Sequence, residues 1–161
     1  MGADEQTEVP IDVPRWAALA QAVLRAEGRA GELTLTFVDR DEIAALNAEH
    51  LGEDGPTDVL SFPLDAADIL DAVTGTSPDV PVLLGDVVIA PAVAAAQAAA
   101  HAGTLDDELA LLVVHGVLHV LGHDHAESDE TALMRAKELT LLEAHHWHGP
   151  APAGFRQEHP A

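Results

Sequence analysis

The chain has 161 residues, of which 48% are hydrophobic and 3% aromatic. This length suits one compact domain whose core is mainly Leu, Val and Ala, and it is short for two domains. The absence of cysteine excludes disulfides and thiolate metal sites, so a tight metal site has to use His, Asp or Glu. The acidic start lacks an apolar signal core, and no stretch reaches about 18 apolar residues. We therefore expect a cytoplasmic protein that makes no membrane contact.

The formal net charge is −21, because 28 carboxylates face only seven lysine and arginine residues. Nucleic-acid-binding proteins usually carry a basic patch that neutralises phosphates. The simplest interpretation of the charge is solubility, including adaptation to a salty cytoplasm. The alternative is that any contact with RNA is local and is assisted by a metal and histidines.

The first third of the chain alternates strand and helix signals. Residues 1–8 are polar and predicted to be flexible, and residues 9–13 read as a short edge strand, where Pro10 is tolerated. Pro14 opens a helix with an apolar stripe that ends near Gly28. Residues 33–38 are the clearest strand, because they are apolar or β-branched throughout.

The middle of the chain continues the alternation. Asp39 or Asp41 is predicted to cap a helix that ends near His50 or Leu51. Two further strands are predicted at residues 57–63 and 82–89, separated by a surface loop at residues 64–80.

The last third is predicted to be helical. Helices are expected over 91–101, from a cap at Thr104 through the histidines that follow Val114, and from Ser128 onward. The last helix should bury Leu133, Met134, Leu139 and Leu142, and residues 149–161 should be a disordered tail. The alternation predicts a single α/β (α+β) domain over residues 9–148, with a small mixed sheet of about four strands and about five helices.

Three histidines follow one another at a spacing that predicts a metal site. His115 and His119 are four residues apart, so their side chains share one helical face. Gly122 is placed to end the helix in a left-handed turn and to bring His125 back toward them. Three imidazoles with an open position are typical of catalytic zinc, and we predict one zinc ion per chain. A closed structural zinc site, or histidines satisfied in a polar pocket, is the alternative.

The spacing matches the metzincin protease pattern His-Glu-x-x-His-x-x-Gly-x-x-His at every place but one. Position 116 is glycine where the protease carries the glutamate that takes a proton from zinc-bound water. The sequence therefore predicts a zincin-like metal site without a peptidase base, which argues against a protease. Asp124 within this motif, and Ser61 and Asp86 in the upstream strands, are candidates for either the site or a purely structural role.

Residues 115–125 resemble the signature of the YbeY family of bacterial endoribonucleases. Leu46-Asn47, residues 57–63 and residues 84–91 resemble further family segments in the same order. The likeness covers roughly residues 8–145. It implies zinc on His115, His119 and His125 and cleavage of single-stranded RNA. It also implies maturation of the 3′ end of 16S ribosomal RNA and ribosome quality control, with the ribosome or its small subunit as partner.

One departure from the family concerns the phosphate. The family commonly has Tyr-Arg after the Leu-Asn helix, and the arginine is thought to help catalysis or bind phosphate. Here these positions are His50 and Leu51. Either His50 takes over part of that role, which makes it a candidate catalytic residue, or the phosphate is held in another way.

The sequence leaves the mechanism and two other functions open. Cleavage would use metal-activated water or the metal as a Lewis acid. The alternatives are a non-catalytic ribosome assembly factor with a structural metal, and a metal-dependent hydrolase of another substrate.

Overall fold

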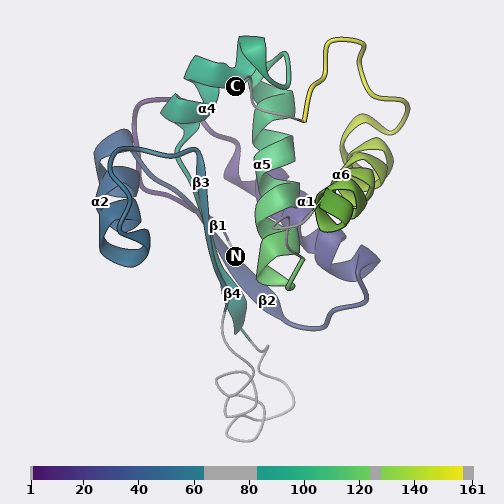
Figure 1. Cartoon of the computed structure of the whole chain (residues 1–161), viewed down its shortest axis with the longest axis horizontal. Coiled ribbons are helices and arrows are strands. Elements are labelled where there is room, and N and C mark those ends of the chain that lie inside the picture. Colours follow the sequence, from purple (N-terminus) through teal and green to yellow (C-terminus); the bar gives the residue numbers. More distant parts are fainter. Residues whose placement is uncertain (1, 64–82, 124–127, 158–161) are drawn as a thin grey trace, which may run out of the picture.

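The computed structural model describes residues 2–63, 83–123 and 128–157 (Figure 1). Four strands of the described chain form one mixed sheet in the order β1-β2-β4-β3. β1 (Gly2–Asp4), β2 (Glu32–Phe37) and β4 (Leu83–Ile89) run parallel, whereas β3 (Val59–Pro63) pairs antiparallel with β4. The predicted single mixed α/β fold with a small sheet is confirmed. The loop predicted at residues 64–80 lies outside the described residues.

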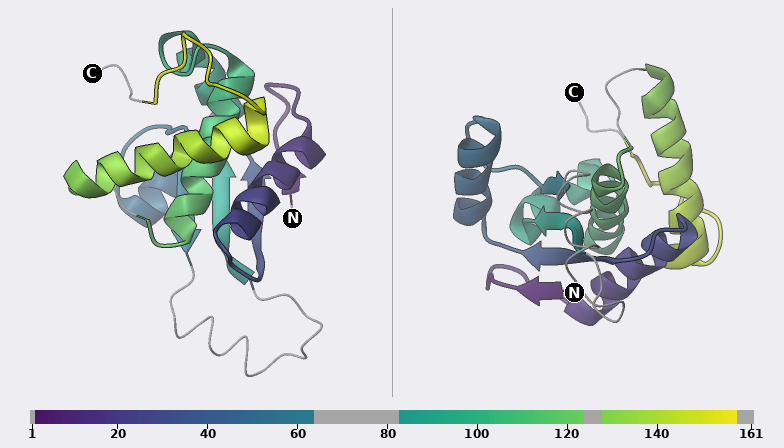
Figure 2. Two further views of the ribbon diagram at one scale, coloured as in Figure 1. Left: turned by 90° about the vertical axis from the view of Figure 1, so that its right-hand side faces the viewer. Right: turned by 90° about the horizontal axis from the view of Figure 1, so that it is seen from below.

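Helices cover both faces of this sheet (Figures 1 and 2). α1 and α5 pack on one face, α2 packs on the other, and α6 lies against α5. The bounds are α1 (Val13–Ala26), α2 (Arg40–Leu51), α4 (Pro91–Gln97), α5 (Leu105–Val120) and α6 (Ser128–Leu142), with a 3-10 turn η1 (Ala98–Ala100) and a π-helical turn η2 (Glu143–Trp147).

Strand alternation explains the two cores. Side chains of a strand point alternately to the two faces of a sheet. Leu35 and Phe37 of β2 therefore join Val87 of β4 in the core beneath α1 and α5. Leu60 of β3 and Val88 of β4 point the other way, into the smaller core beneath α2. The alternation seen in the sequence thus decides which helix each strand residue meets.

Cap residues start the helices largely where the sequence predicts. The Asp39 side chain accepts a hydrogen bond from the backbone of Glu42 and begins α2, and Thr104 accepts one from Asp107 and begins α5. α5 is buried around most of its circumference, as expected for a helix that is apolar on all sides. In α6, Met134 and Leu142 are buried, but Leu133, expected in the core, is 65% exposed.

The N-terminal end differs from the expectation. Residues 9–12 form no strand, and the edge position is taken by Gly2–Asp4, which were expected to be flexible. Gly2 fits there because a Cβ would lie 2.7 Å from Val13 Cγ1 at the start of α1. The buried Gln6 side chain holds the following turn by donating to Asp4 Oδ1 and to the Val9 carbonyl, at 2.8 Å each.

The C-terminal end differs as well. Instead of a disordered tail from residue 149, the structure describes the chain packed on the domain as far as Gln157. The ring of Phe155 meets Trp147 edge to face at 4.7 Å between centroids. Phe155 also packs against the main core, and Gln157 donates to the Arg135 carbonyl at 2.8 Å. An aromatic residue in a Pro- and Ala-rich segment therefore has a partner that only the folded chain supplies.

In the part of the chain that the structure describes, no helix is long and apolar enough to cross a membrane.

Candidate active site

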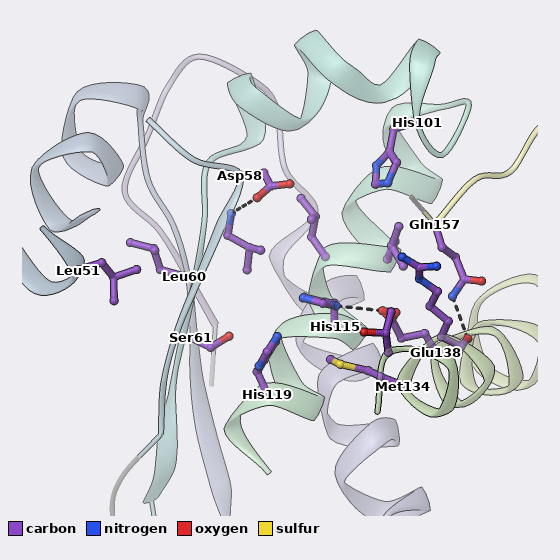
Figure 3. A pocket seen from close by; sticks show the side chains of 15 residues that line it. Leu51, Asp58, Leu60, Ser61, His101, His115, His119, Met134, Glu138 and Gln157 are labelled. Atoms are coloured by element: carbon purple, nitrogen blue, oxygen red, sulfur yellow. Dashed lines mark hydrogen bonds and ion pairs between the residues drawn. The ribbon is translucent and has the colours of Figure 1, made fainter. Parts of the chain in front are cut away.

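A pocket of about 440 Å³ opens between α5, α6, the start of β3 and the end of α2 (Figure 3). Among the described residues that line it, α5 and α6 supply most of the polar groups, and the C-terminal segment contributes Gln157. Its lining residues in the described chain are Leu51, Asp58, Val59, Leu60, Ser61, His101, Leu111, Leu112, His115, His119, Thr131, Met134, Arg135, Glu138 and Gln157.

His115 and His119 lie side by side on successive turns of α5 (Figure 3). Their ring centroids are 4.6 Å apart, with the rings edge to face, and both residues are half-buried. Glu138 of α6 is only 4% exposed and lies across from His115. His115 Nδ1 donates to Glu138 Oε2 at 3.0 Å, which places the lone pair on Nε2. Glu138 therefore gives His115 the tautomer of a metal ligand.

The structure brings together two of the three predicted metal ligands. His125, and the candidate Asp124 beside it, lie outside the described residues. Among the described residues alone, no group of three His, Cys, Asp or Glu side chains is placed to hold a metal. Two adjacent imidazoles in a pocket, one of them oriented by a buried carboxylate, are nevertheless the donors that zinc prefers.

Gly116 packs α5 against the sheet. A Cβ on Gly116 would lie 2.6 Å from Val87 Cγ1 and 3.4 Å from Ser61 Oγ. The Ser61 hydroxyl donates to the Gly116 carbonyl at 3.1 Å, joining β3 to α5. Position 116 thus faces the sheet and has no room for the glutamate of a protease. Ser61 combines a structural bond with a place in the pocket wall, whereas Asp86 is not among the described lining residues.

Two side chains from the motifs that precede the histidines in the sequence, Asn47 and Asp58, hold the segment before β3. Asn47 is buried and donates to the Gly55 carbonyl at 3.0 Å, which fixes the turn after α2. Asp58 accepts hydrogen bonds from the backbone N–H of Val59 and from Gln97, both at 2.8 Å. These bonds hold Asp58 in the wall of the pocket that the histidines of α5 also line.

Comparisons with known proteins identify the family. A sequence profile described as Endoribonuclease YbeY matches residues 2–146. The endoribonuclease YbeY of Salinispora tropica is 43% identical over 146 residues, covering 88% of this chain and 88% of the relative. That of Carboxydothermus hydrogenoformans is 46% identical over 142 residues, covering 86% of this chain and 92% of the relative. The chain belongs to the YbeY family.

A solved structure agrees with this YbeY fold. The solution structure of a protein from Thermotoga maritima matches with a TM-score of 0.58 and 26% sequence identity. The match covers 89% of this chain and 87% of the other. The fold is therefore shared over nearly the whole length of both chains.

The two positions that depart from the YbeY resemblance fall at the end of α2. Leu51 lines the pocket and is 59% exposed, so this wall ends in an apolar side chain. His50 is exposed and its ring meets Phe62 edge to face, with centroids 5.1 Å apart. His50 is not among the described residues that line the pocket, and the structure does not bring it together with His115 and His119.

Sequence reasoning missed the wall that α6 contributes. Thr131, Met134, Arg135 and Glu138 line the pocket at spacings of three and four residues, which places them on one helical face. Thr131, Arg135 and Glu138 are visible in the sequence as polar residues beside the apolar stripe of the last helix, to which Met134 belongs. The sequence does not reveal which element this face of the helix packs against, because α6 and α5 meet only in the folded chain.

Replacing Glu138 by glutamine is expected to weaken Zn²⁺ binding while the fold is kept. The variant loses the carboxylate charge that holds the proton on His115 Nδ1 and keeps the ring in place, and such a loss is usually worth about tenfold to a hundredfold in metal affinity. Competition with a zinc-binding dye measures it. Glu130→Gln changes an exposed carboxylate of the same helix and is the matched control. Equal zinc affinity in the two variants would contradict the role assigned to Glu138.

Glu27 at the end of α1 joins three segments near the site. It accepts hydrogen bonds from His123 Nε2 at 2.8 Å and from Lys137 Nζ at 3.1 Å. Burial opposes ionisation of the Glu27 carboxyl, but the hydrogen bonds and charges of Lys137 and His123 outweigh it, so its pKa lies below the usual range. Because its pKa is lowered by folding, ionised Glu27 stabilises the fold at pH values above the ordinary glutamate pKa. This stabilisation is lost as the pH falls through the pKa of Glu27 in the folded protein.

Glu27→Gln is therefore expected to lower Tm by roughly a few degrees near neutral pH. The difference from the unmodified protein should shrink as pH falls below about 4.3, the ordinary glutamate value. Thermal unfolding followed by circular dichroism over this pH range measures both effects, with Glu53→Gln on an exposed turn as control. A Tm difference that is independent of pH would show that Glu27 acts through packing alone.

Proposed function

We propose that this protein is a zinc-dependent endoribonuclease that cleaves single-stranded RNA, with His115, His119 and His125 as the metal ligands. The observation that carries the proposal is the pair of adjacent imidazoles, one oriented by buried Glu138, at the wall of an open pocket. Membership of the Endoribonuclease YbeY family supports the reaction.

The pocket favours a catalytic role for the metal over a purely structural one. The His115 side chain is 28% exposed, so a ligand can approach it from solvent. Structural zinc sites are usually closed by four protein ligands, whereas catalytic sites keep a position open. When bound, zinc supplies a Lewis acid for the phosphoryl group and lowers the pKa of bound water toward about 7. Glu138 holds the proton on His115 Nδ1 and keeps that ring in place.

We further propose that the RNA is ribosomal. The family resemblance supports maturation of the 3′ end of 16S ribosomal RNA, and ribosome quality control, in the cytoplasm and on the small subunit. The excess of negative charge on the chain is compatible with this only if contact with RNA is confined to a small region. We propose the pocket as that region.

Metal removal and reconstitution tests the proposal. The purified protein is stripped with a chelator and assayed on single-stranded and duplex RNA carrying the 16S 3′ precursor sequence, before and after Zn²⁺ or another divalent ion is restored. Cleavage of the single strand that returns with the metal is expected. Full activity after the metal is gone would contradict the mechanism. Stoichiometric zinc without cleavage would favour the non-catalytic assembly factor.

A further inference from the structure

Arg135 of α6 is the one arginine or lysine among the described residues that line the pocket. The whole chain has seven such residues against 28 carboxylates, so a cation at this place is a scarce feature. Two further basic side chains form ion pairs outside the described lining of the pocket. Arg15 pairs with Asp106 at 3.1 Å, and Lys137 pairs with Glu27.

The positive charge of Arg135 can offset negative charge in the pocket. Among the described residues that line it, Asp58 and Glu138 are acidic and would repel the phosphates of RNA if nothing offset them. Both carboxylates are held by hydrogen bonds, Glu138 to His115 and Asp58 to Gln97. On the opposite wall the end of α2 contributes Leu51, which cannot bind phosphate.

The position of Arg135 on α6 brings it near the histidines. Glu138, three residues further along the same helical face, is in direct contact with His115. A guanidinium has five N–H donors in a planar fork, so it can bind two oxygens of one phosphate while keeping other contacts. The backbone carbonyl of Arg135 accepts a hydrogen bond from Gln157, which anchors the C-terminal segment beside it.

We propose that Arg135 binds a phosphate of the RNA in this pocket and supplies the positive charge that Leu51 does not. This inference rests on the proposed endoribonuclease function. Arg135 thereby offsets the local carboxylates and helps to confine RNA binding to the pocket of an otherwise acidic protein.

Single-turnover cleavage by the metal-loaded protein tests the role. A labelled single-stranded RNA is cleaved with protein in excess at several salt concentrations, which yields the half-saturating protein concentration and the maximal rate. Arg135→Met is expected to raise the half-saturating concentration about tenfold or more, as loss of a hydrogen bond to a charged group does. The slope of its logarithm against log salt should fall by about 0.7, as expected for one lost phosphate contact to a single strand.

Two further variants make the outcome decisive. Arg135→Lys keeps the charge and should restore the salt slope, and it carries the test if the methionine variant does not fold. Arg29→Met removes one positive charge from an exposed position outside the pocket lining and should leave the slope unchanged. The proposal is overturned if Arg135→Met shows the unmodified salt slope, whether or not its maximal rate falls. If the unmodified protein cleaves no RNA, the proposed function itself fails, and this inference fails with it.

Discussion

Replacing His119 by alanine is expected to abolish both zinc binding and RNA cleavage. His119 lies 4.6 Å, centroid to centroid, from His115, and both rings line the pocket. With His119 gone, the two remaining proposed imidazole ligands bind the ion more weakly than three do. The protein then loses the several kcal/mol of transition-state stabilisation that a catalytic metal supplies. The cleavage rate should fall by about a thousandfold or more.

Metal content by atomic emission and cleavage of single-stranded RNA are measured on the same preparation. His145→Ala removes an exposed imidazole outside the pocket lining and should change neither quantity. Loss of zinc from His119→Ala with undiminished cleavage would separate the metal from the reaction. The reverse result, full zinc occupancy with cleavage lost, would place His119 in contact with RNA rather than with the ion.

Replacing Glu108 by alanine is expected to cause a large loss of stability. The Glu108 carboxylate is fully buried at 0% exposure, and it accepts from Nδ1 of His101, which is 2% exposed, at 2.6 Å. Removing one partner of a buried pair leaves the other desolvated without its counterpart and typically costs about 3–5 kcal/mol. For a chain of this size the Tm should fall by roughly 10 °C.

Urea unfolding of three variants measures the effect and its cause. Asp106→Ala removes a carboxylate that is 61% exposed and pairs with Arg15 at the surface, so it should cost less than about 1 kcal/mol. Replacing both partners, as His101→Leu with Glu108→Leu, should recover much of the stability because neither side chain of the pair is then left buried without the other. A Glu108→Ala protein as stable as the Asp106→Ala protein would rule out this account.

Several elements followed from local patterns alone. Strand β2 follows from the run of apolar and β-branched residues at 33–38, and α2 and α5 begin at the predicted cap residues Asp39 and Thr104. The spacing of His115 and His119 predicted neighbouring rings, and the structure places them together. These features need only the geometry of one helix or one strand, so the sequence is sufficient to predict them.

Gly116 illustrates the limit of that reasoning. Its neighbours in the sequence suggested a missing catalytic glutamate, and the structure adds a different cause. The position faces Val87 across the α5–sheet contact, where even a Cβ would lie only 2.6 Å away. A local motif indicates which chemistry is absent, whereas the packing partner explains why glycine is needed.

The sequence by itself determined the mixed α/β class, the order of the main elements and the histidine pair, because these depend on periodicity and capping within short segments. Only the tertiary structure decided that Gly2–Asp4 forms the edge strand and that Phe155 packs on Trp147. It alone joined Glu138 to His115 and set Arg135 in the pocket wall. These pairings connect separate elements, and which residues meet depends on how helices and strands pack, a choice that no local pattern encodes.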